Sequence, residues 1–277
     1  HVGPLPDPHA RLTQREHAMT ALNLKDKIFD TPGYSSDVRL TPEELEVFRA
    51  AITEQWLDVI GRAHPELVAQ FREVGIARYH ELSHLLKHES LWPKQHRCLP
   101  LHSCQQIRGL PFLQTIRAEM GEFAISDVFY GDTHEAGREE IYWRLVRPNA
   151  PRDIGGMHAD KWFHDVMGMD DRAFAAQAET VKIWIPIYSQ PGRNGLMIVP
   201  DSHRRQYRYH GEPGAGGMKP IIDEDPATLG AQLMLTEPGN MLIFNEGILH
   251  GGAVNLGDQT RVSVEITLVF PQRMTKN

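Results

Sequence analysis

The sequence contains few cysteines, no long apolar run and no excess of positive charge. Its 277 residues include only Cys98 and Cys104, too few for a disulfide framework, so a reducing cytoplasmic location is expected. No run of about 18 apolar residues occurs, and the first residues lack the apolar core of a signal peptide, so no membrane association is expected. The formal net charge of −7 argues against nucleic acid or an anionic membrane as the main partner. The partner is therefore expected to be a small molecule, and the oligomeric state is left open.

The first part of the chain has helical character. Thr41 and Glu44 form a capping-box pattern around Pro42, which suits the first turn of a helix. Apolar residues then follow at helical spacing up to Ile60. Shorter helices are expected near 65–72, 78–88 and 111–120. Residues 1–120 thus predict a mostly helical N-terminal layer.

After about residue 121 the pattern changes to short apolar runs rich in β-branched and aromatic residues. Turn signals such as "PGRNG", "EPGN" and "NLGDQ" separate several of these runs. Many short strands without alternating helices indicate an antiparallel sandwich or barrel. We predict one domain over 1–277, mainly β, with a jelly-roll catalytic core over 121–272 and the helices packed against it. The expected strands are 141–147, 180–188, 196–200, 230–236, 240–244 and 261–270.

The segment "GGMHADKWFH" (155–164) places His158 and Asp160 two residues apart. On a strand, such residues share a face and their side chains converge, which makes either half of a metal site or an ordinary polar strand end. A second histidine, His250, stands in "IFNEGILHGG". Arg261 follows eleven residues later, and Ser263 shares its strand face, so the pair offers a guanidinium fork and a hydroxyl to one carboxylate.

Two histidines and one aspartate on one face of a metal leave other coordination positions open. This donor set is typical of the non-haem Fe(II) oxygenases. The open positions could hold a bidentate 2-oxo acid and then O2, and the Arg-x-Ser pair would bind the distal carboxylate of that acid.

These residues, in this order, resemble the Fe(II)/2-oxoglutarate-dependent dioxygenases. More narrowly, "WIPIYSQPGRNGLMIVPDSHR" (184–204) and the ending from "PGN" to Arg261 resemble the phytanoyl-CoA dioxygenase-like superfamily, over roughly 140–270. The resemblance implies a double-stranded β-helix of cupin-like type. It implies that His158, Asp160 and His250 bind Fe(II), that Arg261 and Ser263 anchor 2-oxoglutarate, and that Trp184 lies along the pocket wall. Fe(II), 2-oxoglutarate and O2 are the expected cofactors and cosubstrates, with succinate and CO2 as co-products.

The expected reaction is hydroxylation of an unactivated C–H bond in a small polar metabolite. Desaturation, cyclisation and epimerisation start from the same hydrogen abstraction and stay open. Halogenation is not expected, because iron halogenases of this superfamily carry a small residue at the position of Asp160. A basic and aromatic rim suggests that the metabolite is anionic, unless the rim is only solvated. The residues of this rim are Arg144, Lys161, Trp162, His164, Lys182, Arg204 and Arg205, and the candidate substrate contacts among them are Arg144, Lys161, Trp162 and Lys182.

Two alternatives compete with this interpretation. The first is a cupin-like metal protein that does not use 2-oxoglutarate and therefore does not need the Arg-x-Ser pair. The second is a helical zinc module, because His80, His84 and His88 recur at helical spacing before Cys98 and Cys104. The five residues between the cysteines do not match the spacing of a structural zinc site, which favours a polar or packed helix face.

Overall fold

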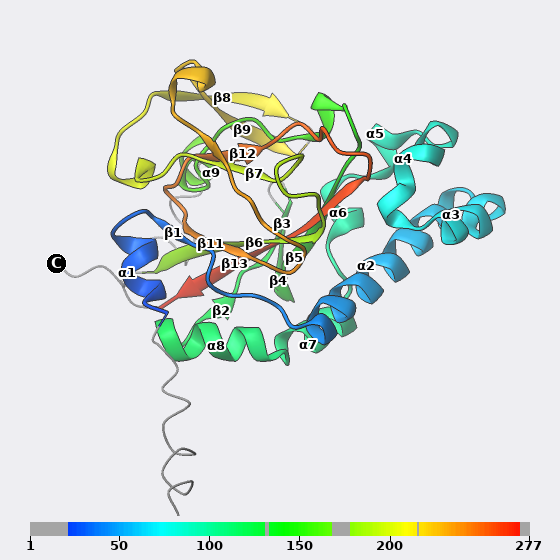
Figure 1. Ribbon diagram of the computed structural model, residues 1–277, viewed down its shortest axis with the longest axis horizontal. Helices are drawn as coiled ribbons and strands as arrows, with labels where there is room; N and C mark the ends of the chain where they lie inside the picture. Colours follow the sequence, from blue (N-terminus) through cyan, green and yellow to red (C-terminus); the bar gives the residue numbers. More distant parts are fainter. Residues whose placement is uncertain (1–21, 131–132, 168–177, 215, 272–277) are drawn as a thin grey trace, which may run out of the picture.

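The structure, a computed structural model, describes residues 22–130, 133–167, 178–214 and 216–271 (Figure 1). The helices in these ranges are α1 (Leu24–Phe29), α2 (Pro42–Ala63), α3 (Val68–Val74), α4 (Tyr79–Leu82), α5 (His88–Leu91), α6 (Lys94–Arg97), α7 (Leu101–Arg108), α8 (Pro111–Met120) and α9 (Lys161–Val166). The strands are β1 (Tyr34–Ser35), β2 (Ala124–Ile125), β3 (Asp127–Tyr130), β4 (Thr133–Glu139), β5 (Ile141–Val146), β6 (Glu179–Tyr188), β7 (Leu196–Ile198), β8 (Tyr209–Gly214), β9 (Gly217–Ile222), β10 (Gln232–Leu233), β11 (Leu242–Asn245), β12 (His250–Gly252) and β13 (Arg261–Phe270).

The longest helix, α2, begins at the predicted capping box. The Glu44 amide donates to the Thr41 hydroxyl (3.2 Å), and the Thr41 amide donates to a Glu44 carboxylate oxygen (2.8 Å). The other Glu44 oxygen accepts from the buried amide of Phe112 at the start of α8 (2.8 Å). One side chain therefore starts α2 and joins it to α8.

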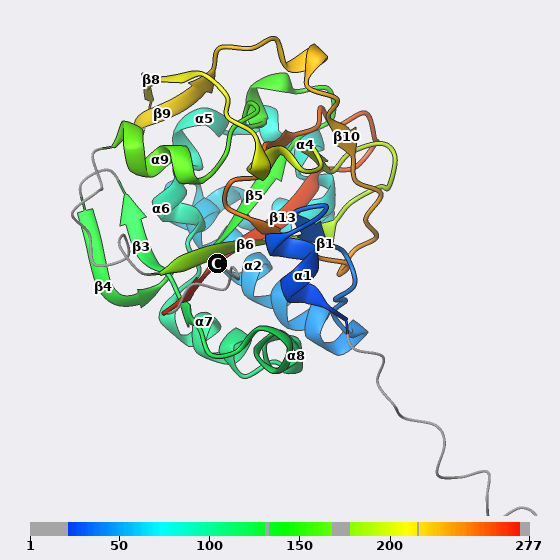
Figure 2. The ribbon, with the colours of Figure 1, turned by 90° about the vertical axis from the view of Figure 1, so that its left-hand side faces the viewer.

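Two antiparallel sheets form the β core. The larger has the order β1-β11-β6-β13-β2, with β5 also paired to β13, and the smaller has the order β10-β7-β12. Figure 1 shows α7 and α8 on one side of the large sheet and the β8–β9 hairpin on the other, and Figure 2 gives the same order from a second direction. A large sheet facing a smaller one fits the predicted double-stranded β-helix.

The two faces of the large sheet have different chemistry because strand side chains alternate. Along β6, alternate residues from Val181 to Ile187 belong to the hydrophobic core that the sheet shares with the helices. The intervening Lys182 and Trp184 face the other way and line a cavity. The same alternation on β13 places Val264 in the core and Glu265 in the cavity. The large sheet thus separates the helical layer from the site.

The fold prediction is confirmed in its main features: a mainly antiparallel β core lies behind helices from the first 120 residues. Two local predictions are wrong. The helix expected over 78–88 is broken, because Leu86 is extended between the turn at Ser83–Leu85 and α5. The strand expected over 230–236 is reduced to β10, and the β8–β9 hairpin was not predicted. No helix in the described ranges is both long and apolar enough to cross a membrane.

Candidate metal centre and cavity

Two histidines distant in sequence are joined through their backbones. The His158 amide donates to the His250 carbonyl, and the His250 amide donates to the His158 carbonyl, each at 2.9 Å. His250 opens β12 in the small sheet, where it pairs with Ile198 of β7. The reciprocal bonds bring the imidazole ring centroids to 4.5 Å. The small sheet therefore fixes both rings at one place.

Asp160 reaches the same point by a route different from the predicted one. It has helical backbone angles (φ −61°, ψ −36°) and precedes α9, so it does not continue a strand from His158. The chain turns between His158, which forms a β-bridge with His250, and the start of α9, and this turn directs the Asp160 carboxylate toward the two imidazole rings. Its Oδ1 lies 3.6 Å from Nε2 of His158 and 3.8 Å from Nε2 of His250. The predicted convergence is present, but turn geometry produces it in place of the two-residue strand repeat.

Backbone carbonyls set the orientation of both imidazoles. Nδ1 of His158 donates to the Gly156 carbonyl (2.8 Å), and Nδ1 of His250 donates to the Ile248 carbonyl (3.0 Å). A ring that carries its proton on Nδ1 has a free lone pair on Nε2. Both Nε2 atoms face Asp160, so two nitrogen donors and one oxygen donor point into one space.

The electrostatics keep these donors in the forms that bind a metal. Burial lowers the pKa of His250 to about 4, so its ring is neutral at physiological pH. Burial alone would raise the pKa of Asp160, but Lys182 and the two histidines hold it well below its usual range. The Lys182 ammonium lies 3.6 Å from Oδ2 of Asp160, and that buried oxygen accepts no hydrogen bond. The three donor atoms lie within 4.8 Å of one another, which fits a divalent metal with open positions.

Arg261 lines the same cavity as the three candidate metal ligands, and both it and Ser263, on the same strand, have unused hydrogen-bonding atoms. Both are buried, and both Nε of Arg261 and Oγ of Ser263 lack a partner. One Arg261 nitrogen donates to the Gly195 carbonyl, and the guanidinium stands 6.0 Å from the Trp184 ring. Burial lowers the pKa of Arg261 to about 10. A buried cation without a carboxylate partner, next to an unpaired hydroxyl, fits the carboxylate of a bound acid.

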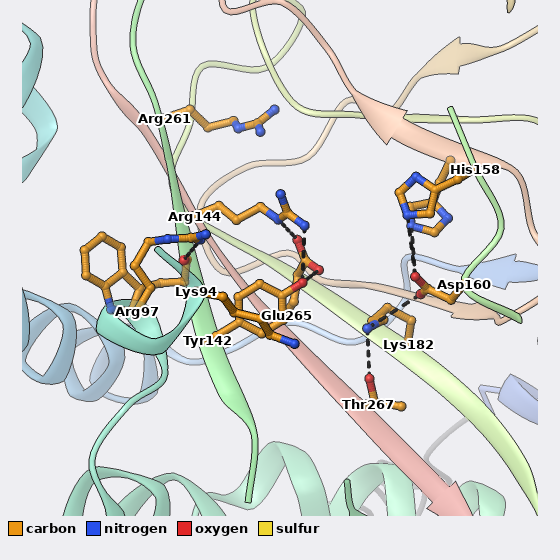
Figure 3. A network of polar contacts seen from close by, with 12 residues as sticks. Lys94, Arg97, Tyr142, Arg144, His158, Asp160, Lys182, Arg261, Glu265 and Thr267 are labelled. Carbon is orange, nitrogen blue, oxygen red and sulfur yellow. Dashed lines mark hydrogen bonds and ion pairs between the residues drawn. The ribbon is translucent and has the colours of Figure 1, made fainter. Parts of the chain in front are cut away.

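The cavity between the two sheets has a volume of about 960 Å³. It extends from the proposed metal ligands along one face of the large sheet, and its lining includes residues of α6 and of the β8–β9 hairpin. A cavity of this size is at the upper end of the range for small-molecule sites, so it can hold a cofactor together with a substrate. Figure 3 shows the charged residues that line it. Glu265 and Lys182 lie between His158 and Asp160 on one side and three arginines on the other.

Two of the four predicted substrate contacts line this cavity. Arg144 does so, but it forms an ion pair with Glu265, and Lys182 lies between Asp160 and Thr267. The charges of both are therefore already compensated within the protein.

The other two predicted contacts do not line the cavity. The Trp162 ring is buried against Tyr209 with 4.3 Å between ring centroids, so its apolar surface is already covered. The exposed Lys161 begins α9 and is outside the lining. The four predicted substrate contacts are thus reduced to the two strand residues Arg144 and Lys182, and His164 of the predicted rim also lines the cavity.

Two functional candidates were not predicted from the sequence. Glu265 belongs to the same face of β13 as Ser263, and the two-residue repeat could have indicated it. It accepts hydrogen bonds from Tyr142 and Arg144, and Arg144 and Lys182 outweigh its burial and lower its pKa to about 2. Arg97 lines the cavity from α6, and no motif marked it because α6 lies outside the recognisable segment.

The helical zinc alternative finds no support in the described residues. His158, Asp160 and His250 are the one group there whose donor atoms could share an ion. His80 contacts the Thr260 hydroxyl, and His88 contacts the Tyr79 hydroxyl. These histidines act as ordinary hydrogen-bonding partners in the helical layer.

Comparisons with known proteins agree with this geometry. The sequence model of the family described as phytanoyl-CoA dioxygenase (PhyH) matches residues 40–263. The non-haem monooxygenase ThoJ in its apo form is 14% identical with a TM-score of 0.53, over 90% of this chain and 80% of that one. AviO1 from Streptomyces viridochromogenes Tue57 is 12% identical with a TM-score of 0.50, over 92% of this chain and 97% of that one.

At such low identity, the structural likenesses show the fold alone. No curated protein sequence matches the chain. The family match does not depend on either likeness, since it spans most of the helical layer and the β core up to Ser263. The chain therefore belongs to the phytanoyl-CoA dioxygenase family.

Proposed function

We propose that this non-haem Fe(II)/2-oxoglutarate-dependent oxygenase hydroxylates an unactivated C–H bond of a small polar metabolite, with succinate and CO2 as co-products. One observation carries the proposal. Three oriented metal donors share a cavity with a buried arginine, and this arginine and the buried serine two residues later on the same strand each have a hydrogen-bonding atom that lacks a partner. The family match supports Fe(II) and 2-oxoglutarate as the groups that use these residues.

His158, Asp160 and His250 would hold the iron. Their donor atoms are preoriented by backbone contacts, so binding would require little rearrangement. Iron with 2-oxoglutarate and O2 supplies the oxidation of the C–H bond, and the protein supplies position and exclusion of water. Asp160 keeps an oxygen donor at the third protein position, which favours oxygenation over halogenation.

Arg261, Ser263 and Trp184 would hold 2-oxoglutarate. The guanidinium and the hydroxyl would donate to its distal carboxylate, and this contact would restore the partners that both groups lack. Trp184 is buried under the guanidinium and limits where the cofactor can lie. Lys182, which donates a hydrogen bond to Thr267, lies 3.6 Å from the second oxygen of Asp160 and would help to orient this carboxylate.

A substrate screen tests the proposed reaction. Purified protein is incubated with Fe(II), 2-oxoglutarate, O2 and a metabolite mixture, and the products are analysed by mass spectrometry. We expect one metabolite to gain the mass of one oxygen atom, in step with succinate formation. The same incubation with His158→Ala is the control. A product that has lost two hydrogens would show desaturation and contradict hydroxylation.

A further inference from the structure

Three arginines meet at the end of the cavity away from the metal residues. Arg97 comes from α6, Arg144 from β5 and Arg261 from β13 (Figure 3). Arg144 lies close enough to weaken the charged form of both others, since it lowers the pKa of each beyond the effect of burial. Within the described residues, the one carboxylate that forms an ion pair with this group is Glu265, which pairs with Arg144. Two of the three guanidinium groups therefore form no ion pair with a described carboxylate.

The distal carboxylate of bound 2-oxoglutarate would form an ion pair with one of these arginines. Under the proposed function, that arginine is Arg261, because Ser263 beside it also lacks a hydrogen-bond partner. Arg97 is then the remaining member of the three arginines that has no ion pair with a described carboxylate. Lys94 on the same helix differs, because its ammonium lies 2.8 Å from Glu140.

Neutral groups hold the Arg97 guanidinium in place. Nε donates to the Trp92 carbonyl (3.0 Å), and Nη1 donates to the Trp143 carbonyl (2.6 Å). Nη2 makes no hydrogen bond with any described residue, and the side chain lines the cavity. These two carbonyls orient the guanidinium but, being neutral, do not form an ion pair with it. A half-buried cation that is fixed in this way and forms no ion pair with a described carboxylate is suited to a ligand anion.

We propose that Arg97 recognises an anionic oxyacid group of the substrate, a carboxylate or a phosphate, while the reacting C–H bond lies toward the metal residues. The inference rests on the proposed function, because it assigns Arg261 to the cofactor. It makes Arg97 a specificity-determining residue contributed by the helical layer. It also assigns the remaining charge of the arginine group, since Arg144 is held by Glu265.

Binding measurements test the assignment without turnover. The protein is loaded with Mn(II) and saturating 2-oxoglutarate, and calorimetry then follows titration with propionate, methyl phosphate or the neutral propionamide. The wild type should bind at least one anion and not propionamide. Arg97→Gln keeps donors for the two carbonyls but loses the charge, so it should weaken anion binding by about ten- to hundredfold. Arg97→Lys should retain part of the affinity.

Arg208→Gln is the matched control, since its side chain is 84% exposed and lies outside the cavity lining. It should bind the anions as the wild type does. Equal binding of propionamide, or unchanged anion affinity in Arg97→Gln, would overturn the assignment. An equal loss of 2-oxoglutarate affinity in Arg97→Gln would place Arg97 in the cofactor site and overturn it too. Unchanged 2-oxoglutarate affinity in Arg261→Leu would instead refute the proposed cofactor clamp, and selective loss of anion binding in Arg97→Gln would still support Arg97.

Discussion

Each of the three proposed metal donors is held by its own local contact. The Gly156 and Ile248 carbonyls fix the two rings, and the start of α9 fixes Asp160. Such contacts orient ligands before a metal arrives. Loss of one donor atom should therefore affect metal binding far more than it affects the fold.

Removal of either histidine tests this expectation. His158→Ala and His250→Ala should each weaken divalent metal binding by more than about 100-fold, since even residues that only orient a ligand contribute about 10- to 100-fold. Atomic spectroscopy after dialysis against Fe(II) measures the metal content. His84→Ala, at an exposed position in the helical layer, should retain the wild-type content. Full metal content in both site variants would refute the centre.

The buried arginine of β13 gives a second prediction at this scale. Arg261→Leu should weaken 2-oxoglutarate binding by about ten- to hundredfold, because a charge-assisted contact contributes about 1.5–3 kcal/mol. Metal binding should be unaffected. Calorimetric titration of the Mn(II)-loaded protein with 2-oxoglutarate measures the effect. If the affinity is unchanged, the carboxylate is bound elsewhere, and Arg144 is the next candidate.

Site residues could be predicted from the sequence where they form an uncommon pattern. His158, Asp160 and His250 could be grouped because a His-x-Asp pair followed by a distant histidine matches the ligand pattern of a metal site. Trp162 could not be placed, since its contact with Tyr209 depends on a hairpin that no local pattern predicted. Arg97 could not be found either, because an arginine on a four-residue helix is usually a surface residue.

Among the elements, α2 depends most visibly on one side chain. Glu44 accepts amide hydrogen bonds from Thr41 and Phe112, whereas the Thr41 hydroxyl accepts one from a described residue, the Glu44 amide. We therefore expect Glu44 to contribute more than Thr41 to the free energy of unfolding.

Urea denaturation should show that ranking. Thr41→Ala should lower the free energy of unfolding by about 1 kcal/mol, a typical cost for a lost cap. Glu44→Ala should lower it further, because a buried amide that loses its acceptor costs about 1–3 kcal/mol. Glu46→Ala, with a largely exposed side chain, should change it by less than about 0.5 kcal/mol. A smaller effect in Glu44→Ala than in Thr41→Ala would show that the contact with α8 is dispensable.

The cavity face of the large sheet is stabilised by charge pairing across strands. Glu265 on β13 lies opposite Tyr142 on β5 and near Lys182 on β6, and Arg144 pairs with it. Glu265→Gln would leave the partly exposed Arg144 and the half-buried Lys182 without this carboxylate. It should lower the free energy of unfolding at neutral pH by about 1.5–3 kcal/mol, the contribution of hydrogen bonds to charged groups.

The same substitution should also change the acid response. The pKa of Glu265 is lowered from 4.5 to about 2 in the folded protein, so its contribution is complete above about pH 4.5 and is lost as the pH falls toward 2. The stability difference between the wild type and Glu265→Gln should therefore narrow over that interval in denaturation series. Glu135→Gln, in a more exposed ion pair, is the control. A difference that stays constant with pH would contradict the buried charge pairing.

The long elements were predictable because propensity and burial agree in them. β6 and β13 alternate between core and cavity, and α2 carries both a cap and an apolar stripe. The stretch 78–88 was mispredicted because its histidine spacing resembles a helix face although Leu86 is extended. The shortened β10 and the β8–β9 hairpin depend on contacts made across the molecule.

At the scale of the whole molecule, the cavity joins all the layers. Residues of α6, of the large sheet, of the small sheet and of the β8–β9 hairpin share its lining. A ligand bound there contacts only the folded arrangement, so its binding energy adds to global stability.

Thermal unfolding should show this linkage. Mn(II) and 2-oxoglutarate together, at about 100 times their dissociation constants, should raise the melting temperature by about 5–10 °C. His250→Ala should lose most of this shift, because it lacks a metal donor. An equal shift in the wild type and in His250→Ala would mean that the ligands act elsewhere.

The reciprocal backbone bonds between His158 and His250 bear on how the protein would acquire its metal. A flexible chain that gathers two distant donors around an ion loses conformational entropy during binding, and this loss lowers affinity. Here the ladder pair brings the donors together during folding. The two imidazoles would therefore behave as a preformed bidentate chelator, and metal binding would cost the surrounding chain little conformational entropy.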